Sequence, residues 1–568
     1  MSTQDFIHSL EQGRLAKWVI FFVIIILFAL GEGWFVFWHF RGLSEAKGMD
    51  QAQIAREIAS GDGFSTKNIT PLAYAMFKKK GAFPLAKTPD IYEAPLNPMI
   101  NSVFLGLVKK HWAYTEKDLL YVPDQVIASL SIVFLGLGIA VNFLTASRVF
   151  DSRIAGLATG LVIVCNRLWE FTTTGLPQLL MFFIFSCALY VLFRAIEARR
   201  QEKPVLGWLS MVAFLFGLLA LAHALAIWIF VGLLVFTLYY FVPRGQAAVV
   251  MLAIFMVVYA PWLARNYKVC GNPFGLGYLS VIGTMDGSES DRMRSQDTST
   301  TGLGLGALRS QMRAEFIKQT SGIYGYLGGN PMAPVFFVTL LYVFKRKEAG
   351  DLLWCVFLML LFAFCGMCIS GADSPNDLYI LFTPVVTLYG FAYVMMLWAR
   401  LEFNIPILRY IFIFFIYLIA AVPLLANIMN AMPTGMPNWP PYSPSGIAYI
   451  NKWTLPNEIV ASDQPWAVAW YGNRKSLLIP GTMDDFLNFC DWTEFSDDME
   501  ALYLTPITGD QKFVSEVIKG GSKDWAPYVS RSVNYMKSEF PFHYLVALPS
   551  DNECSFYAKN NRWAPKTD

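Results

Sequence analysis

Two acidic residues stand in polar segments that follow a long apolar run. Asp50 opens a stretch in which Ile54 and Ile58 recur at helical spacing, so we expect a helix lying on the outer membrane surface. Glu93 lies in "YEAPLNPMI", where two prolines forbid a regular helix and leave the carboxylate on a rigid turn. A carboxylate within hydrogen-bond reach of a hydroxyl can remove its proton. The alternative for Asp50 is an N-cap, since aspartate often satisfies free N–H groups at a helix start.

A basic residue and its neighbour close a later apolar run. The segment "YAPWLARNYKVCGNP" places Arg265 and Asn266 just beyond the run that ends at Trp262. A planar guanidinium can pair with two phosphate oxygens at once, so this position suits an anionic headgroup. The alternative is that Trp262 and Arg265 only anchor the helix at the membrane interface.

A histidine between two apolar runs is a candidate metal ligand. His223 lies in "LALAHALAIW", and zinc accepts both imidazole and carboxylate, so His223 could share a divalent ion with Glu93. The sequence has neither HxxxH nor HxH spacing to support this. A hydrogen-bonded histidine is the other interpretation.

The elements that must position these residues are apolar. Hydrophobic residues make up 55% of the 568 residues and charged residues only 15%, against roughly 25% charged in soluble domains. A membrane span needs about 20 apolar residues. We therefore predict a polytopic α-helical membrane protein with about 11 transmembrane helices, near residues 18–40, 124–146, 154–169, 176–196, 206–222, 225–241, 246–262, 331–344, 351–369, 377–399 and 408–429.

Charge placement predicts the orientation of these spans. The links near 170, 223 and 373 hold Arg167 as their one basic residue, whereas the opposite links carry Arg148, Arg153, Arg199, Arg200, Lys203, Arg244, Lys345, Arg346, Lys347, Arg400 and Arg409. The positive-inside rule then places the N-terminus in the cytoplasm and everything after residue 430 outside. The transmembrane domain is predicted to cover 1–429, with external loops at 41–123 and 263–330. No cleavage site follows the first run, so we interpret it as a retained anchor.

Residues 430–568 are predicted to form an extracytoplasmic α/β domain. The short apolar runs "EIVASD", "SLLIP", "ALYLTP" and "HYLVALP" alternate with helical stretches, which is the pattern of a small parallel sheet. An oxidising compartment would permit a bridge between Cys490 and Cys554, and the sequence leaves their pairing open.

Several of these segments together resemble a known family. The external acid after the first span, "GDGFS", the "YEAP" turn, "PWLARNYKVCGNP" and the "WYGNR" of the tail are similar to the GT-C superfamily of membrane glycosyltransferases. The branch that the chain resembles contains protein O-mannosyltransferases and bacterial lipid A aminoarabinose transferases. The resemblance implies transfer of a hexose or pentose from a polyprenyl-phosphate donor to a lipid, glycan or protein on the external face, with inversion at the anomeric carbon.

The resemblance also implies roles for single residues. Asp50 would be the general base or an acceptor-orienting carboxylate, and Glu93 a second acid near the donor phosphate, with or without a divalent ion. Arg265, with Asn266 beside it, would bind that phosphate.

Two further sites follow from the same resemblance. The family commonly carries an acid at the start of the fourth span, where this chain has Gln178, so the nearby Glu170 is the candidate second acid. Trp470, Tyr471 and Arg474 of "WYGNR" are candidates for acceptor binding, or they form a structural turn.

Two other classes of function stay open at this point. One is a transporter or flippase for lipid-linked sugars, and the other is a non-catalytic assembly subunit of the cell envelope. The net charge of +2 gives no reason to expect nucleic acid. We expect a multi-pass protein of the bacterial inner membrane with its C-terminal domain in the periplasm. Its expected partners are a polyprenyl-phosphate sugar, membrane lipids and the acceptor, and its one candidate cofactor is the divalent ion.

Overall fold

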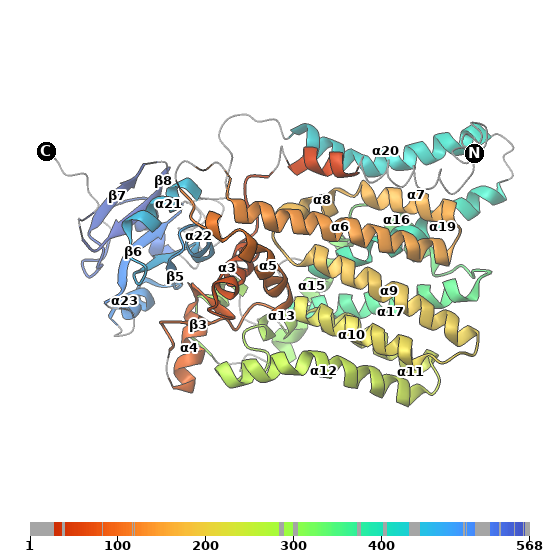
Figure 1. Ribbon diagram of the computed structural model, residues 1–568, viewed down its shortest axis with the longest axis horizontal. Helices are drawn as coiled ribbons and strands as arrows, with labels where there is room; N and C mark the ends of the chain where they lie inside the picture. The colour runs from red at the N-terminus through yellow and green to blue at the C-terminus, as the bar shows by residue number, and fades with distance from the viewer. Residues whose placement is uncertain are drawn as a thin grey trace.

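A bundle of long helices carries a sheet with shorter helices at one of its ends (Figure 1). The computed structural model describes residues 28–36, 40–81, 83–115, 118, 120–282, 289–298, 305–371, 376–401, 406–430, 444–491, 495, 497–505, 523–532, 536–549, 551–560 and 562.

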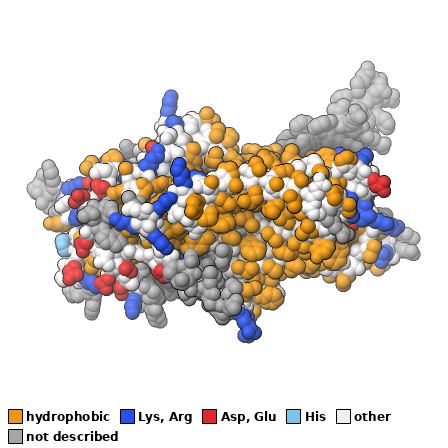
Figure 2. Space-filling model, turned by 90° about the horizontal axis from the view of Figure 1, so that it is seen from below, with side chains coloured by type: hydrophobic (Ala, Val, Ile, Leu, Met, Phe, Trp, Pro, Cys, Tyr) orange, Lys and Arg blue, Asp and Glu red, His pale blue; other side chains and the backbone are white. Residues whose placement is uncertain are grey.

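Long apolar helices form the bundle. Within the described ranges, six helices are long and apolar enough to cross a membrane, or up to seven if α7 (Ser152–Ile163) and α8 (Asn166–Glu170), which meet at 55°, are one span. The six are α6 (Val122–Val149), α9 (Gln178–Arg200), α12 (Arg244–Cys270), α17 (Lys347–Ser370), α19 (Thr383–Arg400) with the turn before it, and α20 (Pro406–Asn430). Hydrophobic side chains cover the middle of the face drawn in Figure 2, and charged side chains gather toward both ends. The chain is therefore a multi-pass membrane protein.

The other predicted spans coincide with shorter helices. These are α10 (Leu206–Ala222), α11 (Ala226–Tyr240) and α16 (Met332–Thr339). The run predicted at 18–40 lies mostly outside the described residues, and residues 28–36 of it are helical.

Neighbouring helices of the bundle pack closely because glycine allows it. α6 lies against α7 and α9, α9 against α10, α10 against α12, and α11 against α17. A Cβ at Gly138 of α6 would come within 2.4 Å of the Phe182 ring on α9, and one at Gly366 of α17 within 2.2 Å of Trp228 on α11. A side chain larger than hydrogen would force these helix pairs apart.

Basic residues gather at the end of the bundle that lies away from the sheet. Figure 1 shows the links α6–α7, α9–α10 and α11–α12 at that end. Glu197 there accepts from Arg148 at 2.8 Å and from Arg346 at 3.0 Å, and Arg200 pairs with Asp351 at 2.6 Å. Basic residues predicted for one side of the membrane therefore share one end of the molecule.

The sheet has six strands in the order β2-β5-β4-β6-β8-β7. Their bounds are β2 (Asn68–Ile69), β4 (Ile459–Ser462), β5 (Lys475–Leu478), β6 (Met499–Leu504), β7 (Tyr544–Leu548) and β8 (Asp551–Ala558). The four strands predicted in the tail are confirmed. The prediction of a small parallel sheet is confirmed for β2, β5, β4 and β6, but it fails at one edge, where β8 pairs antiparallel with both β6 and β7. Only residues 549–550 join β7 to β8, and so short a connection permits antiparallel pairing alone.

One strand of the sheet comes from the loop at 41–123. Residues Asn68 and Ile69 pair in parallel with Ser476 and Leu477 of β5. The helices α3 (Ala46–Ser60), α4 (Pro71–Lys80) and α5 (Leu96–Leu107) of this loop lie around the sheet with α22 (Pro465–Tyr471) and α23 (Met483–Asp491). The loop and the tail therefore form their hydrophobic clusters together: one contains α4 and α23 residues, and the other contains α3 and α22 residues. The prediction that two prolines forbid a regular helix at 92–100 is wrong from Leu96 on, because Pro98 stands in the first turn of α5, where a helix does not need its N–H.

The helix that contains Asp50 is not a surface helix. Every residue of α3 from Gly48 to Glu57 is buried. A Cβ at Gly48 would lie 2.0 Å from the carbonyl oxygen of Thr174, so glycine is needed where α3 meets the segment before α9. The prediction of a helix lying on the membrane surface is wrong because the sheet and the bundle enclose α3 from both sides.

The tail cysteines are free thiols in the structure. Cys554 is buried in the cluster that contains the α22 residues, whereas Cys490 packs against the cluster that contains the α23 residues. The bridge that the sequence left open does not form.

Candidate functional site

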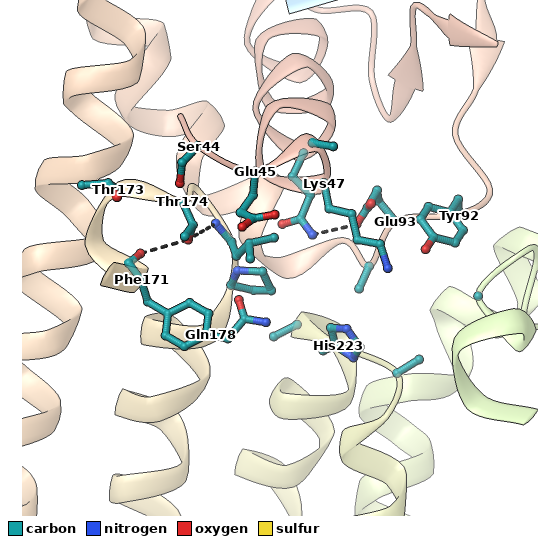
Figure 3. Close-up of a pocket in the computed structure, with 18 of the residues that line it drawn as sticks. Ser44, Glu45, Lys47, Tyr92, Glu93, Phe171, Thr173, Thr174, Gln178 and His223 are labelled. Atoms are coloured by element: carbon teal, nitrogen blue, oxygen red, sulfur yellow. Dashed lines mark hydrogen bonds between the residues drawn. The ribbon is translucent and has the colours of Figure 1, made fainter. Parts of the chain in front are cut away.

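Two cavities meet at the end of the bundle that carries the sheet. The larger, of about 550 Å³, lies between the membrane helices and the start of α3, and the smaller, of about 220 Å³, lies between α3, the segment 88–93 and the sheet. Both are lined by Ala46, Lys47, Tyr92 and Glu93. Figure 3 shows Lys47 and Glu93 above His223 and Gln178 in the larger cavity. The four residues that line both cavities therefore form a wall common to the two.

Asp50 lies inside α3 and lines the smaller cavity. The N-cap of α3 is Glu45, so the interpretation of Asp50 as a cap is wrong. Its side chain accepts a hydrogen bond from Asn68, and its Oδ1 is buried without a hydrogen-bond partner among the described residues. Burial, and after it the charge of Asp90, raises the pKa of Asp50. A carboxylate with a raised pKa is a stronger base at the moment of proton transfer.

Glu93 is fixed by a chain of amides. Gln51 donates to Glu93 Oε2 at 2.6 Å, and Asn97 donates to Gln51 Oε1 at 2.7 Å. The other oxygen, Oε1, is buried and has no partner within the described chain. Burial, then the charges of Asp50 and Asp90, raise the pKa of Glu93, and Lys47 opposes them.

A third buried carboxyl group, Asp90, was missed by sequence reasoning. It accepts from the backbone N–H groups of Tyr92 at 3.1 Å and Glu93 at 2.8 Å, which holds the turn that presents Glu93. Burial raises the pKa of Asp90, and these two hydrogen bonds and Arg265 oppose the rise. The charges of Asp50 and Asp90 both raise the pKa of Glu93, and the charge of Asp90 raises the pKa of Asp50, so these three buried carboxyl groups cannot all be ionised at low cost. The signal in the sequence that could have identified Asp90 is its place three residues before Glu93.

Positive groups face the larger cavity from two sides. Lys47 comes from the first turn of α3, and Arg167 comes from α8. Sequence reasoning did not place either at the site. Two signals were available. Lys47 stands three residues before Asp50 on a helix, and Arg167 is the one basic residue in the links near 170, 223 and 373.

Glu170 lines the same cavity as Glu93, but its two oxygens are engaged. Arg167 donates to Oε2 at 2.6 Å and Asn166 donates to Oε1 at 2.7 Å. The ion pair makes Glu170 a partner for Arg167 at the cavity wall. Gln178, which stands where an acid was expected, is buried at the start of α9 and lines this cavity too.

Arg265 is not among the residues that line either cavity in the described part of the chain. Its guanidinium donates to the carbonyl oxygens of Asp90 and of Phe64, the latter at 3.1 Å, and to Asn266 Oδ1 at 2.8 Å. It lies over the rings of Trp262 and Phe64, 4.8 and 5.2 Å from their centroids. Arg265 and Asn266 thus hold the segments that contain Phe64 and Asp90 against the end of α12, which favours a structural role for both.

The predicted metal ligands share the larger cavity without forming a metal site. Glu93 and His223 both line it. His223 Nδ1 accepts from the Leu225 N–H at 3.3 Å, and the charge of Lys47 acts on Glu93. The described residues contain no group of three or more His, Cys, Asp or Glu side chains that could hold an ion. The donor set of the described residues does not fit a protein-held metal.

The fold is similar to solved structures over nearly all of the chain. ArnT from Cupriavidus metallidurans bound to undecaprenyl phosphate matches with a TM-score of 0.55 at 13% identity, covering 96% of this chain and 98% of that one. The archaeal oligosaccharyltransferase AglB from Archaeoglobus fulgidus, in complex with an inhibitory peptide and a dolichol-phosphate, matches with a TM-score of 0.56 at 13% identity, covering 96% and 75%. Both neighbours are GT-C superfamily members. The chain has a GT-C fold. The resemblance predicted from its motifs is confirmed at the level of the fold.

A third match is the Archaeoglobus fulgidus oligosaccharyltransferase in complex with Zn and sulfate, with a TM-score of 0.55 at 13% identity, covering 94% of this chain and 73% of that one. No protein-family model matches the sequence, and no curated protein matches it.

The aromatic pair of "WYGNR" lies away from both cavities of this GT-C fold. Trp470 and Tyr471 are buried, and they donate to the two oxygens of Asp124 at 2.7 and 2.9 Å. Asp124 belongs to the first turn of α6. Arg474 donates to the carbonyl oxygens of Asn451 and Thr454, both at 2.7 Å. These contacts join the tail to the bundle and to itself, which favours a structural role for the three residues.

Proposed function

We propose that the protein transfers a sugar from a polyprenyl-phosphate donor to an acceptor hydroxyl on the side of the membrane where the sheet lies. The observation that carries the proposal is the common wall of the two cavities, where Lys47 and Glu93 face both sides and Asp50 opens into the smaller one. The fold supports it, since neighbours with this fold are described with undecaprenyl phosphate or a dolichol-phosphate bound.

The larger cavity suits the donor headgroup. Its volume of about 550 Å³ falls within the roughly 300 to 1,000 Å³ usual for ligand pockets. It lies where the membrane helices end, so a prenyl chain can stay in lipid while its phosphate meets Lys47 and Arg167. A guanidinium and an ammonium stabilise the charge that develops on a departing phosphate. We propose these two residues, in place of Arg265, as the phosphate-binding pair.

The smaller cavity suits the acceptor. As the acceptor oxygen bonds to the anomeric carbon, its proton passes to the Asp50 carboxylate. The bond from this carbon to the phosphate oxygen breaks, and its electron pair leaves with the phosphate. Attack from the side opposite the phosphate inverts the anomeric carbon. Glu93, at the common wall, is proposed to orient the sugar or the acceptor between the two.

The distribution of charge supports one orientation in the membrane. Arg148, Arg200 and Arg346 lie at the end of the bundle away from the sheet, and the positive-inside rule assigns such an end to the cytoplasm. We propose a bacterial inner-membrane protein with the sheet in the periplasm, a transmembrane domain at 1–429 and a second domain at 430–568.

Mass spectrometry of lipid that copurifies with the protein tests the proposal. A bound polyprenyl phosphate or its sugar conjugate, together with transfer to added acceptor glycans or lipids, is the expected result. A preparation that carries no such lipid and gains no thermal stability from undecaprenyl phosphate would contradict it. Bound lipid that the wild-type protein flips across vesicles without transfer would favour the flippase.

Replacing Lys47 by glutamine is expected to weaken donor binding. The substitution removes one of the two cations proposed for the phosphate, and a hydrogen bond to a charged group contributes about 1.5 to 3 kcal/mol. The apparent affinity for undecaprenyl phosphate, measured by thermal stabilisation, should fall by about 10- to 100-fold. Lys87→Gln is the matched control, because Lys87 is exposed and pairs with Asp62 at 3.3 Å outside both cavities. Equal affinities in the two variants would remove Lys47 from the phosphate site.

The rate of transfer is expected to rise with pH over a range above the usual carboxyl pKa. Asp50 acts only when ionised, and burial together with Asp90 raises its pKa, so its protonation at low pH stops the reaction. Asp90→Asn removes the like charge, lowers the pKa of Asp50 and should shift the acidic limb of the pH–rate profile to lower pH. Asp491→Asn, at an exposed position, should leave the limb in place. An acidic limb that does not move in Asp90→Asn would show that the charge of Asp90 does not act on the general base.

A further inference from the structure

The side chain that holds the Asp50 carboxylate belongs to the sheet of the tail. Asn68 hydrogen-bonds to Asp50, and Asn68 is also the first residue of β2, the strand at one edge of this sheet. Asn68 pairs with Ser476 of β5. A residue of the sheet therefore contacts the proposed base directly.

The segment 66–68 is tied to α3 by a second side chain. Gln53, one turn after Asp50, is fully buried, and its Oε1 accepts from Thr66 Oγ1 at 3.0 Å and from the Lys67 N–H at 3.2 Å. Residues three apart on a helix share a face, so Asp50 and Gln53 hold the same segment.

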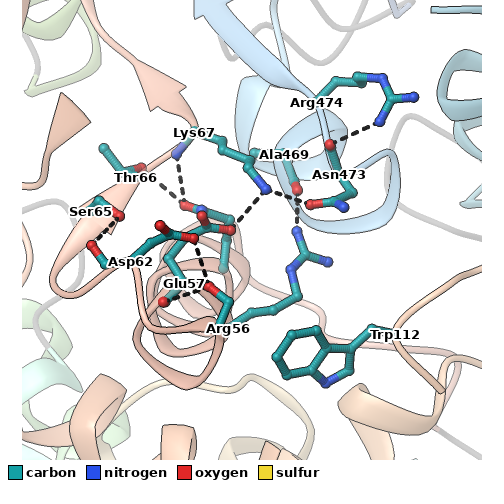
Figure 4. A network of polar contacts seen from close by, with 12 residues as sticks. Arg56, Glu57, Asp62, Ser65, Thr66, Lys67, Trp112, Ala469, Asn473 and Arg474 are labelled. Atoms are coloured by element: carbon teal, nitrogen blue, oxygen red, sulfur yellow. Dashed lines mark hydrogen bonds and ion pairs between the residues drawn. The ribbon is translucent and has the colours of Figure 1, made fainter. Parts of the chain in front are cut away.

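The same segment is tied to β5 and to the turn before it. The Ser476 N–H donates to the carbonyl oxygen of Lys67 at 2.8 Å. The Lys67 ammonium lies 2.9 Å from Glu57 of α3 and donates to Asn473 at 2.7 Å, as Figure 4 shows. Lys67 thus bridges α3 and the tail, and the position of Asn68 depends on both.

The side-chain amide of Asn68 uses only one of its two polar groups within the described chain. Its N–H side serves Asp50, whereas its Oδ1 is buried with no partner among the described residues. Asn68 and Asp50 both line the smaller cavity. The open oxygen of Asn68 and the open Oδ1 of Asp50 therefore supply two buried hydrogen-bond acceptors to one cavity, which suits a ligand that brings hydroxyl donors.

We propose that Asn68 is a positioning residue: its amide N–H orients the Asp50 carboxylate toward the acceptor hydroxyl, and pairing of β2 with β5 sets the place of this amide. The sheet of the tail is then a working part of the reaction centre, beyond any part in recognising the acceptor. This inference rests on the proposed function.

The test replaces Asn68 by threonine, which suits a strand and lacks the amide. The value of kcat should fall by about 10- to 100-fold, the range of a hydrogen bond to a charged group, while stabilisation by undecaprenyl phosphate is kept. The hydrogen bond from Asn68 lowers the pKa of Asp50, so its loss should shift the acidic limb of the pH–rate profile to higher pH. A merely structural strand residue would not move the limb.

A double-mutant cycle shows whether Asn68 acts through Asp50. In an Asp50→Asn background, Asn68→Thr should cost less than twofold further, because the group that it positions is gone. Asn457→Ala is the matched control, since Asn457 is exposed beside the same sheet and bonds weakly to Asp498 at 3.4 Å. It should leave kcat and the limb unchanged.

The outcomes separate this inference from the proposed function. Absence of transfer in the wild-type protein overturns the proposed function. Transfer in the wild type with an unmoved limb in Asn68→Thr, or with equal losses in both backgrounds, overturns the positioning role alone. Failure of both Asn68→Thr and Asn68→Ser to give folded protein would assign Asn68 to the stability of β2, which also overturns it.

Discussion

Replacing Asp50 by asparagine is expected to lower the rate of sugar transfer by about 10² to 10⁴-fold, the usual contribution of a positioned general base. Asparagine has nearly the same shape, so it can keep the contact with Asn68 and the packing of α3. It cannot take the proton of the acceptor hydroxyl at any pH. The measurement is transfer of labelled sugar from a polyprenyl-phosphate donor in membranes or detergent.

The control for this prediction is Asp62→Asn. Asp62 lies just beyond the end of α3, is exposed, and pairs with Lys87 outside both cavities. Both variants should keep the thermal stabilisation by undecaprenyl phosphate, because neither residue faces the larger cavity. Wild-type transfer by Asp50→Asn would end the assignment of Asp50 as base, whatever the fold.

The second large effect is expected on stability, at the joint between the bundle and the tail. Asp124 is fully buried in the first turn of α6 and accepts from Trp470 and Tyr471. Asp124→Ala leaves two buried donors without an acceptor. At about 1.5 to 3 kcal/mol for each hydrogen bond to a charged group, the free energy of unfolding should fall by about 3 to 6 kcal/mol. Denaturant or thermal unfolding in detergent measures this loss.

Two variants make the Asp124 prediction specific. Asp124→Asn keeps one acceptor oxygen and should lose less stability than Asp124→Ala. Asp497→Ala, at an exposed position of the tail, should unfold close to the wild type. An Asp124→Ala protein as stable as Asp497→Ala would show that this joint carries little of the fold's stability. The transfer activity of Asp124→Ala should also fall, because α22, which carries Trp470, also contacts α3. Arg56 of α3 donates to the carbonyl oxygens of Ala469 and Trp470, both at 2.7 Å.

Local pattern was enough to predict the long helices of the bundle and four of the six strands of the large sheet. Apolar runs predicted the long helices because a helix in lipid must be apolar along about 20 residues. Strands β4, β5, β6 and β7 were predicted from short apolar runs between turn residues. Strand β2 was not, because a strand of two residues has no period to detect, and its partner lies some 400 positions away in the chain.

The candidate site divides in the same way. Asp50 and Glu93 were singled out because a carboxylate after a membrane span is conspicuous, and both line the cavities. Arg265 and Trp470 were singled out for their types, but the partners that occupy their polar groups, the carbonyl oxygen of Phe64 and the carboxylate of Asp124, are remote in sequence. Lys47 and Arg167 lacked any motif, and only the cavity brings them together.

The sequence by itself determined that this protein spans a membrane many times, that its tail forms a sheet, and that acidic groups follow the first apolar run. These properties follow from composition and from periods of two or 3.6 residues, which act over short stretches of chain. Tertiary structure alone decided that a strand from the loop completes the sheet and that α3 is enclosed. It also decided which charged side chains face a cavity and which donate to backbone carbonyl oxygens. Those outcomes depend on contacts between segments hundreds of residues apart, and a single sequence carries no local signal of them.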